Sequence, residues 1–144
     1  MNKALKQSQQ HAEEALPFNF PQGMAGFAEA NDFGFIYGGH GNIACMQSID
    51  HPEAAFLITP WDENRLGAPP ALTQEQASCL DLAQNQRPLW MLVLNPFADD
   101  AWVTANLRAP VAINMEARIG IQCIQSNPNL ELRYQWMPQP DQVT

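Results

Sequence analysis

Apolar and polar residues alternate with a period of two along much of the chain, which is typical of β-strands. The clearest example is the stretch 103–124, VTANLRAPVAINMEARIGIQCI, in which the apolar runs 111–115 and 119–123 flank a charged turn. This stretch predicts a β-hairpin with an aliphatic face toward the core. The predicted inward residues are Val111, Ile113, Ile119 and Ile121.

Further strands are predicted wherever short apolar or alternating runs are bounded by turn residues. The run AAFLIT is apolar throughout and is expected to be covered on both faces, and PLWMLVLN is expected at the centre of the core. The glycine cluster Gly38–Asn42 predicts a hairpin turn, because it lacks both the GxGxxG spacing and the GK[ST] ending of phosphate loops. The remaining strand segments are 18–20, 32–37, 43–49, 102–107 and 130–136.

One short surface helix is predicted after the irregular connection 60–72. Thr73 is a favourable N-cap, and Gln76 three residues later completes a capping box. Apolar residues at helical spacing continue the pattern to about Asn85. Their stripe is narrow, so the helix is expected on the surface.

About nine short strands and one helix predict an all-β, mainly antiparallel fold. Either a small β-barrel-like domain or a strongly curved sandwich fits this pattern. Residues 17–137 are predicted to form a single domain. The segment 1–16 is expected to be a frayed helix or disordered, and 138–144 a C-terminal tail.

The charge balance excludes one class of partner. The 144 residues include 15 acidic and 7 basic side chains, for a net charge of −8. A surface that binds phosphate needs the opposite sign, so direct nucleic-acid binding is not expected. The acidity fits simple solubility or attraction to a basic protein. The apolar runs are too short to span a membrane, and a cytoplasmic protein is expected, monomeric when free.

Candidate chemistry is sparse. The three cysteines have no CxxC spacing, and the histidines are scattered through the N-terminal tail and two turns, so neither a metal site nor a bound cofactor is predicted. Cys45 lies near Ser48 and His51 but inside an apolar strand, where a thiol is inert. No catalytic residue is therefore assigned. The alternative kept open is a small-molecule-binding barrel or an enzyme that uses the Gly38–Asn42 turn and Cys45.

Candidate partner-binding residues lie on the predicted loops, where binding residues concentrate. Asp62, Glu63 and Asp99 are expected to steer a basic partner. Asn106 is interpreted as capping a turn, and Arg108 either faces a partner or pairs internally with a carboxylate. The complete predicted set is Trp61, Asp62, Glu63, Asp99, Asp100, Asn106 and Arg108.

Three segments carry a resemblance to the flagellar assembly factor FliW family. They are FPQGMAGF, MQSIDHPEAAFLITP and VTANLRAPVAINMEARIGIQ. In the third, TANL, AP, IN and R-x-G-x-Q occur together at the spacing found in that family. The sequence departs from the family at Ala25, where proline is usual, and in the loop 61–72.

The resemblance implies a small β-barrel-like domain without enzymatic activity. Members of the family bind flagellin in the cytoplasm, and in many bacteria they also bind the RNA-binding translational regulator CsrA. Secretion of flagellin then frees the FliW-like protein, which captures CsrA and relieves repression of flagellin translation. The same functions are expected here.

Overall fold

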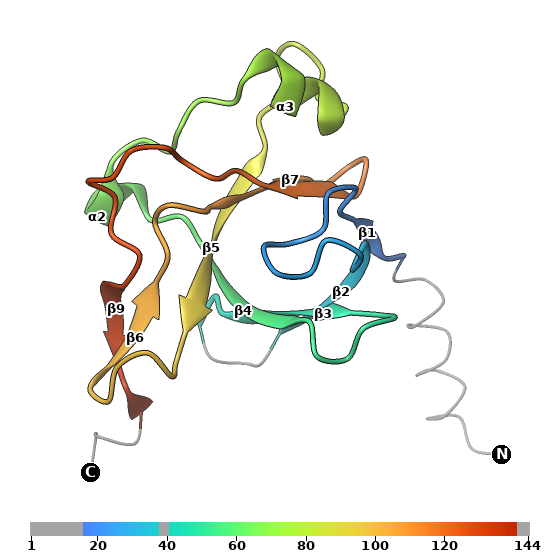
Figure 1. Ribbon diagram of the computed structural model, residues 1–144. Helices are drawn as coiled ribbons and strands as arrows, with labels where there is room; N and C mark the ends of the chain where they lie inside the picture. The colour runs from blue at the N-terminus through green and yellow to red at the C-terminus, as the bar shows by residue number, and fades with distance from the viewer. Residues whose placement is uncertain (1–15, 38–40, 141–144) are drawn as a thin grey trace, which may run out of the picture.

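The computed structural model describes residues 16–37 and 41–140. Nine strands and two short helices occur in this part of the chain (Figure 1). The helices are α2 (Glu63–Leu66) and α3 (Gln74–Cys79). The strands are β1 Phe18–Asn19, β2 Asp32–Tyr37, β3 Ala44–Ser48, β4 Ala55–Pro60, β5 Leu89–Asn95, β6 Trp102–Ala105, β7 Val111–Asn114, β8 Ile119–Gln122 and β9 Tyr134–Pro138.

Seven of the strands close into a barrel. Their order is β4-β3-β2-β1-β8-β7-β5, and β5 pairs again with β4. All of these neighbours are antiparallel except β1 and β8, which run parallel and pair through Asn19 and Ile119. The all-β, mainly antiparallel prediction is confirmed, and the closed ring decides for the barrel over the sandwich. β6 and β9 extend the sheet from β5 and lie beside the barrel (Figure 1). We call this pair the β6–β9 arm.

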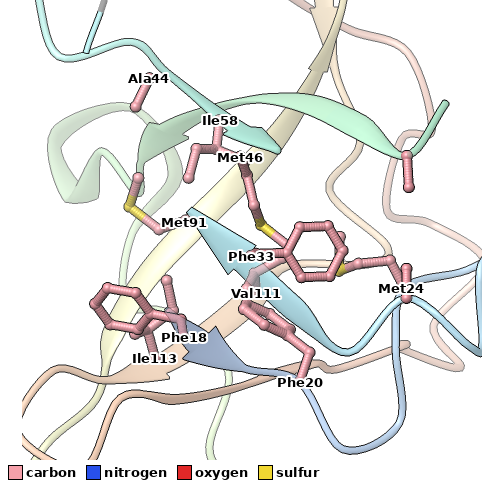
Figure 2. Close-up of a cluster of buried hydrophobic side chains, with 12 residues drawn as sticks. Phe18, Phe20, Met24, Phe33, Ala44, Met46, Ile58, Met91, Val111 and Ile113 are labelled. Atoms are coloured by element: carbon pink, nitrogen blue, oxygen red, sulfur yellow. The ribbon is translucent and has the colours of Figure 1, made fainter. Parts of the chain in front are cut away.

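The barrel interior is filled by aromatic, methionine and aliphatic side chains that point toward one another (Figure 2). Phe20 and Phe33 are fully buried and pack edge to face, with ring centroids 5.2 Å apart. The Phe20 ring lies against Gly120 of β8, where a Cβ would come within 2.3 Å of it. Any side chain at this point of β8 would therefore displace the Phe20 ring.

The hairpin formed by β7 and β8 is confirmed, but its faces differ from the prediction. Opposite residues share a face, and the register pairs Ile113 with Gly120 and Ala112 with Ile121. Val111 and Ile113 therefore face the barrel interior, whereas Ile121 packs on the outer side with Leu80 and Trp90. Ile119 packs on this outer side as well. The expectation of one shared inward face is wrong, because both faces of the hairpin are covered.

The predicted N-terminus of helix α3 is confirmed, since Thr73 and Gln76 form the reciprocal capping box. The helix ends at Cys79, several residues before the predicted end. Asp81 has a positive φ of 54°, which breaks the helix. The Nδ2 group of Asn114 donates to the carbonyl oxygens of Leu80 (2.8 Å) and Asp81 (3.3 Å), which fixes this turn against β7.

Three further features differ from those expected from the sequence, namely an additional helix and the two ends of β9. The connection 60–72 contains a second helix, α2, where only irregular chain was predicted. β9 begins at Tyr134 rather than near residue 130. It continues to Pro138, and Gln139 is hydrogen-bonded, so ordered contacts reach into the predicted C-terminal tail.

Other expectations have mixed outcomes. β2 and β3 form the antiparallel pair that the glycine turn predicts, although residues 38–40 of that turn lie outside the described residues. The predicted N-terminal tail also lies outside them, except for Leu16. In β4, Ile58 is buried in the interior and Leu57 packs outside it, as the apolar run suggests, but Ala55 is exposed. β5 contributes to all three hydrophobic clusters and is the centre of the core, as expected.

Candidate protein-binding cleft

A cleft separates the β6–β9 arm from the outer face of the barrel strands β3 and β4. It has two adjoining compartments of about 690 Å³ and about 660 Å³, and the side chains of Ile43 and Met137 line both. We call the whole feature the β9 cleft, because residues of β9 or immediately after it line both compartments. The first compartment is bordered by α2 and has a mixed lining, and we call it the polar compartment because its polar share is the larger of the two. The second is almost entirely apolar, and we call it the apolar compartment.

Two residues at the start of α2 shape the polar compartment. Asp62 is the N-cap of this helix, where its Oδ1 accepts a hydrogen bond from the backbone N–H of Asn64 at 3.0 Å. The indole Nε1 of Trp61 donates to the carbonyl oxygen of Gly67 at 2.8 Å. The Trp61 side chain packs against two hydrophobic clusters outside the barrel interior, one around Leu80 and one around Leu92. This corner of the compartment is therefore held by side chain to backbone bonds.

Arg65 of α2 binds the outer edge of β9. Its guanidinium donates to the carbonyl oxygens of Trp136 (3.0 Å) and Gln135 (3.1 Å). It also stacks over the Trp136 ring, with its Cζ atom 4.1 Å from the ring centroid. The β6–β9 ladder shifts register opposite Val103 and Thr104. Arg65 thus joins helix α2 to a terminal strand that has a β-bulge.

The second compartment presents few polar groups. Its wall includes Leu57 and Leu94 from the barrel side and Val103 and Met137 from the arm. The Gln139 amide nitrogen is directed away to the β5–β6 turn, where it donates to the carbonyl oxygens of Pro96 (2.6 Å), Asp99 (3.1 Å) and Trp102 (3.2 Å). A neighbouring hollow of about 350 Å³ continues the apolar surface to Phe97.

The structure brings three of the predicted partner-binding residues together. Trp61, Asp62 and Glu63 all line the polar compartment. Asp99 and Asp100 belong to the β5–β6 turn, at the other end of the arm, which also holds Phe97. Asp99 has a structural role as well, because its Oδ1 accepts from the backbone N–H groups of Ala101 (2.7 Å) and Trp102 (3.0 Å).

The other two predicted residues, Asn106 and Arg108, are not among those that line the cleft. Asn106 accepts from the backbone N–H of Arg108 at 2.9 Å, which fits the predicted turn cap. The Arg108 side chain donates to the carbonyl oxygens of Leu130 and Pro128, both at 2.7 Å. These bonds go to backbone carbonyls rather than to a carboxylate, so within the described residues Arg108 braces the loop before β9. Its alternative interpretation as a partner-facing charge stays a prediction.

Sequence reasoning missed several residues that shape the cleft. Arg65 had no signal beyond its charge, because the strand edge that it contacts is distant in sequence. Ile36 and Phe97 were apolar residues at a strand end and in a turn, and their side chains are 60% and 92% exposed. The sequence signal that could have identified Phe97 is the presence of a large apolar residue in a predicted turn.

The described residues show no catalytic grouping around Cys45. This thiol lies in the apolar compartment, beside Leu57 and Leu94. His51 lines a different hollow and pairs with Glu53, with Nδ1 3.6 Å from Oε1. Burial, with a smaller effect of nearby Cys79, raises the pKa of the Cys123 thiol to about 11. Within 16–37 and 41–140, no group of three or more His, Cys, Asp or Glu side chains is placed to hold a metal ion.

Comparison with known proteins agrees with the fold and with the sequence motifs. The family model described as FliW protein matches residues 2–136, which is most of the chain. The chain belongs to the FliW family. Across its described residues, no helix has the length and apolar character needed to cross a membrane.

Several relatives carry the name flagellar assembly factor FliW. The protein of Geotalea uraniireducens is 29% identical over 112 residues, covering 78% of this chain and 69% of the relative. The Bdellovibrio bacteriovorus protein is 33% identical, covering 79% of this chain and 66% of the relative. The Borrelia turicatae protein is 32% identical, covering 85% and 94%. The chain thus spans about two thirds of the first two relatives and nearly all of the third.

A solved structure supports the fold of this FliW family member. The crystal structure of a flagellar assembly factor FliW superposes with a TM-score of 0.74 and covers 89% of each chain at 24% sequence identity. At this identity the agreement concerns the backbone fold. The backbone fold of this chain is therefore similar to that of a known FliW structure.

Proposed function

We propose that this protein is a non-enzymatic, protein-binding regulator of flagellar assembly, with flagellin as one partner and CsrA as another. Membership of the FliW family carries the proposal, since relatives that cover most of this chain are named flagellar assembly factors. In this scheme the protein acts in the cytoplasm. It binds flagellin before export, and flagellin secretion frees it to capture CsrA and relieve repression of flagellin translation.

Two features of the molecule support a binding role. The β9 cleft has an exposed carboxylate at Glu63 and a partly covered indole at Trp61, a combination suited to contact with another protein. The net charge of −8 favours association with a basic partner, and CsrA, as an RNA-binding regulator, fits that description.

Binding to purified partners tests the proposal. The full chain is titrated separately with monomeric flagellin and with CsrA from the same bacterium, and heat release and light scattering are followed. Saturable binding of flagellin at micromolar concentrations is expected. Binding of neither flagellin nor CsrA would contradict the proposed function.

Charge reversal at Glu63 tests whether the acidic side of the cleft steers association with CsrA. Glu63→Lys is expected to slow association at low salt and to flatten its salt dependence. Glu63 is preferred to Asp62 because the Asp62 carboxylate caps α2. Glu29→Lys is the matched control, since Glu29 is also exposed but lines a separate hollow with Phe27 and His51. Equal association rates for the two variants would remove Glu63 from the encounter surface.

A further inference from the structure

The apolar compartment of the β9 cleft adjoins large apolar side chains that nothing in the described chain covers. Ile36 at the end of β2 is 60% exposed and lines the compartment. Phe97 in the β5–β6 turn is 92% exposed and lines the adjoining hollow. Single exposed apolar residues are common, but a continuous apolar surface with two such residues at its borders marks an interaction site.

The charged groups near this surface are mostly of one sign. Asp62 and Glu63 lie in the polar compartment at one end, and Asp99 and Asp100 lie in the turn beside Phe97 at the other. Among the described residues that line the two compartments and the hollow, Arg65 is the one basic side chain, and its guanidinium is bonded to the carbonyl oxygens of β9. A partner with positive charge at both ends and an apolar middle would match this distribution.

The shape of the cleft selects the form of that partner. The floor of the apolar compartment is formed by Ile36, Cys45, Leu57 and Leu94, which lie opposite one another in the register of β2, β3, β4 and β5 and so share one face of the sheet. An occupant of this floor meets the side chains of paired strands rather than a free strand edge. Side-chain recognition of this kind suits an amphipathic helix lying in a groove. The lining of the two compartments includes five consecutive residues, Trp136 to Pro140, which span at most roughly 16 Å and so leave room for no more than about three turns of helix.

We propose that the apolar compartment receives an amphipathic helix of about three turns from the partner protein, with its apolar side in the cleft and Lys or Arg near both ends. The proposal rests on the proposed function in one respect, namely that the partner is a protein. It adds where that protein binds and which segment it uses. Recognition depends on apolar burial by Ile36, Phe97 and the floor of the compartment, with the acidic ends setting orientation and rate.

A synthetic peptide pair tests this chemistry without assuming the partner. One labelled peptide carries Leu at positions i, i+3, i+4 and i+7 with Lys at both ends, and its twin carries Glu at the ends. Fluorescence anisotropy with the full chain should show saturable binding of the Lys peptide and at least several-fold weaker binding of the Glu peptide. Equal binding of the two, or binding of neither, would overturn the proposal.

Variants of the exposed apolar residues locate the peptide. Phe97→Ser and Ile36→Ser are each expected to weaken binding of the Lys peptide about tenfold, because each removes a large apolar contact. Both side chains are largely exposed, so the fold should be retained. Ile124→Ser is the matched control, since Ile124 is 71% exposed and is not among the residues lining the cleft. Equal weakening by the control and the cleft variants would place the peptide elsewhere and refute the proposal.

A second readout comes from Cys45, which lines the compartment. Alkylation by iodoacetamide, mapped to individual cysteines by mass spectrometry, should be slower at Cys45 when the Lys peptide is bound. An unchanged rate under saturating peptide would contradict occupancy of the compartment. Sedimentation of the wild-type chain is run alongside. A dimer that Phe97→Ser converts to monomer would show that the occupant is a second copy, which would also overturn the proposal.

The same variants with flagellin separate this inference from the proposed function. If flagellin binds the wild type and Phe97→Ser weakens binding while Ile124→Ser does not, the cleft is the flagellin site. If Phe97→Ser binds both flagellin and CsrA like the wild type, the proposed function stands and the docking inference fails. If flagellin and CsrA do not bind but the Lys peptide binds at the cleft, the docking inference stands and the proposed function fails.

Discussion

The contact between Phe20 and Gly120 makes a prediction that the structure specifies closely. A Cβ added at Gly120 would lie 2.3, 2.5 and 2.9 Å from three carbon atoms of the Phe20 ring. Non-bonded carbons pack at roughly 3.5–4.0 Å, so the ring would have to move by about 1 Å or more. Phe20 is fully buried and packs edge to face on Phe33, which leaves it little space. We therefore expect Gly120→Ala to destabilise the barrel.

The size of the loss follows from two opposing effects. Overpacking a well-packed interior costs about 1–3 kcal/mol. Replacing glycine by alanine restricts the unfolded chain and returns about 0.4–1 kcal/mol where the backbone tolerates a side chain. Gly120 has no positive φ, so this smaller gain applies. The clash should prevail, and the free energy of unfolding should fall by about 2 kcal/mol. For a chain of this size, that loss corresponds to a drop in Tm of roughly 4–8 °C.

Urea and thermal unfolding, followed by circular dichroism, measure this difference. Gly34→Ala in β2 is the matched control, because it has no positive φ and an added Cβ there meets nothing within 4 Å. It should leave stability unchanged or raise it slightly. In a Phe20→Leu background, Gly120→Ala should cost less than it does alone, because the shorter side chain makes room. Equal stabilities for Gly120→Ala and Gly34→Ala would refute the packing argument.

Three further predictions concern other parts of the fold. Val111→Asp places a charge at a fully buried position in the barrel interior, so circular dichroism and gel filtration should show an unfolded or aggregated chain; a folded monomer would contradict this. Arg65→Ala should speed hydrogen exchange of the β9 amides, because the two carbonyl contacts are lost. Arg65→Lys should restore little protection, because an ammonium group cannot reproduce the planar contact with two carbonyl oxygens. Wild-type protection of β9 in both variants would exclude the bracing role. Iodoacetamide at pH 8 should modify Cys45 but not Cys123 in the folded chain. Burial raises the pKa of Cys123 from 9.0 to about 11, so between these pH values the thiol ionises readily only in the unfolded chain. The free energy of unfolding should therefore fall as the pH rises from 9 to 11. The fall should be smaller in Cys123→Ala.

Local patterns in the sequence predicted the strands well. Period-two alternation and turn residues depend on neighbours along the chain, and both the β7–β8 hairpin and the β2–β3 pair follow from them. The capping box at Thr73 is local in the same way. The end of that helix was not predictable, because the turn at Asp81 is held by Asn114 of a strand far along the chain.

The outer face of the hairpin and the cleft could not be predicted from local patterns either, because both depend on contacts between segments that are distant in sequence. Ala112 and Ile121 are buried on the outer side because the segment around Leu80 packs over them, which alternation within the hairpin cannot reveal. The β9 cleft depends on where the arm lies relative to β3 and β4. Loop position and charge selected Trp61, Asp62 and Glu63, which line the polar compartment, and also Arg108, which braces a loop. Whether the first three contact a partner stays a prediction.

The parallel junction of β1 with β8 has a consequence for the order of folding. It joins Asn19, near the start of the described chain, to Ile119 in the second strand from its end. A chain leaving the ribosome cannot complete the ring until Ile119 has emerged, and contacts between such distant residues form slowly because a long loop must first be closed. Until then the aromatic residues around Phe20 lack their partner strand. The time between synthesis and ring closure is therefore when this protein is most exposed to proteases and aggregation.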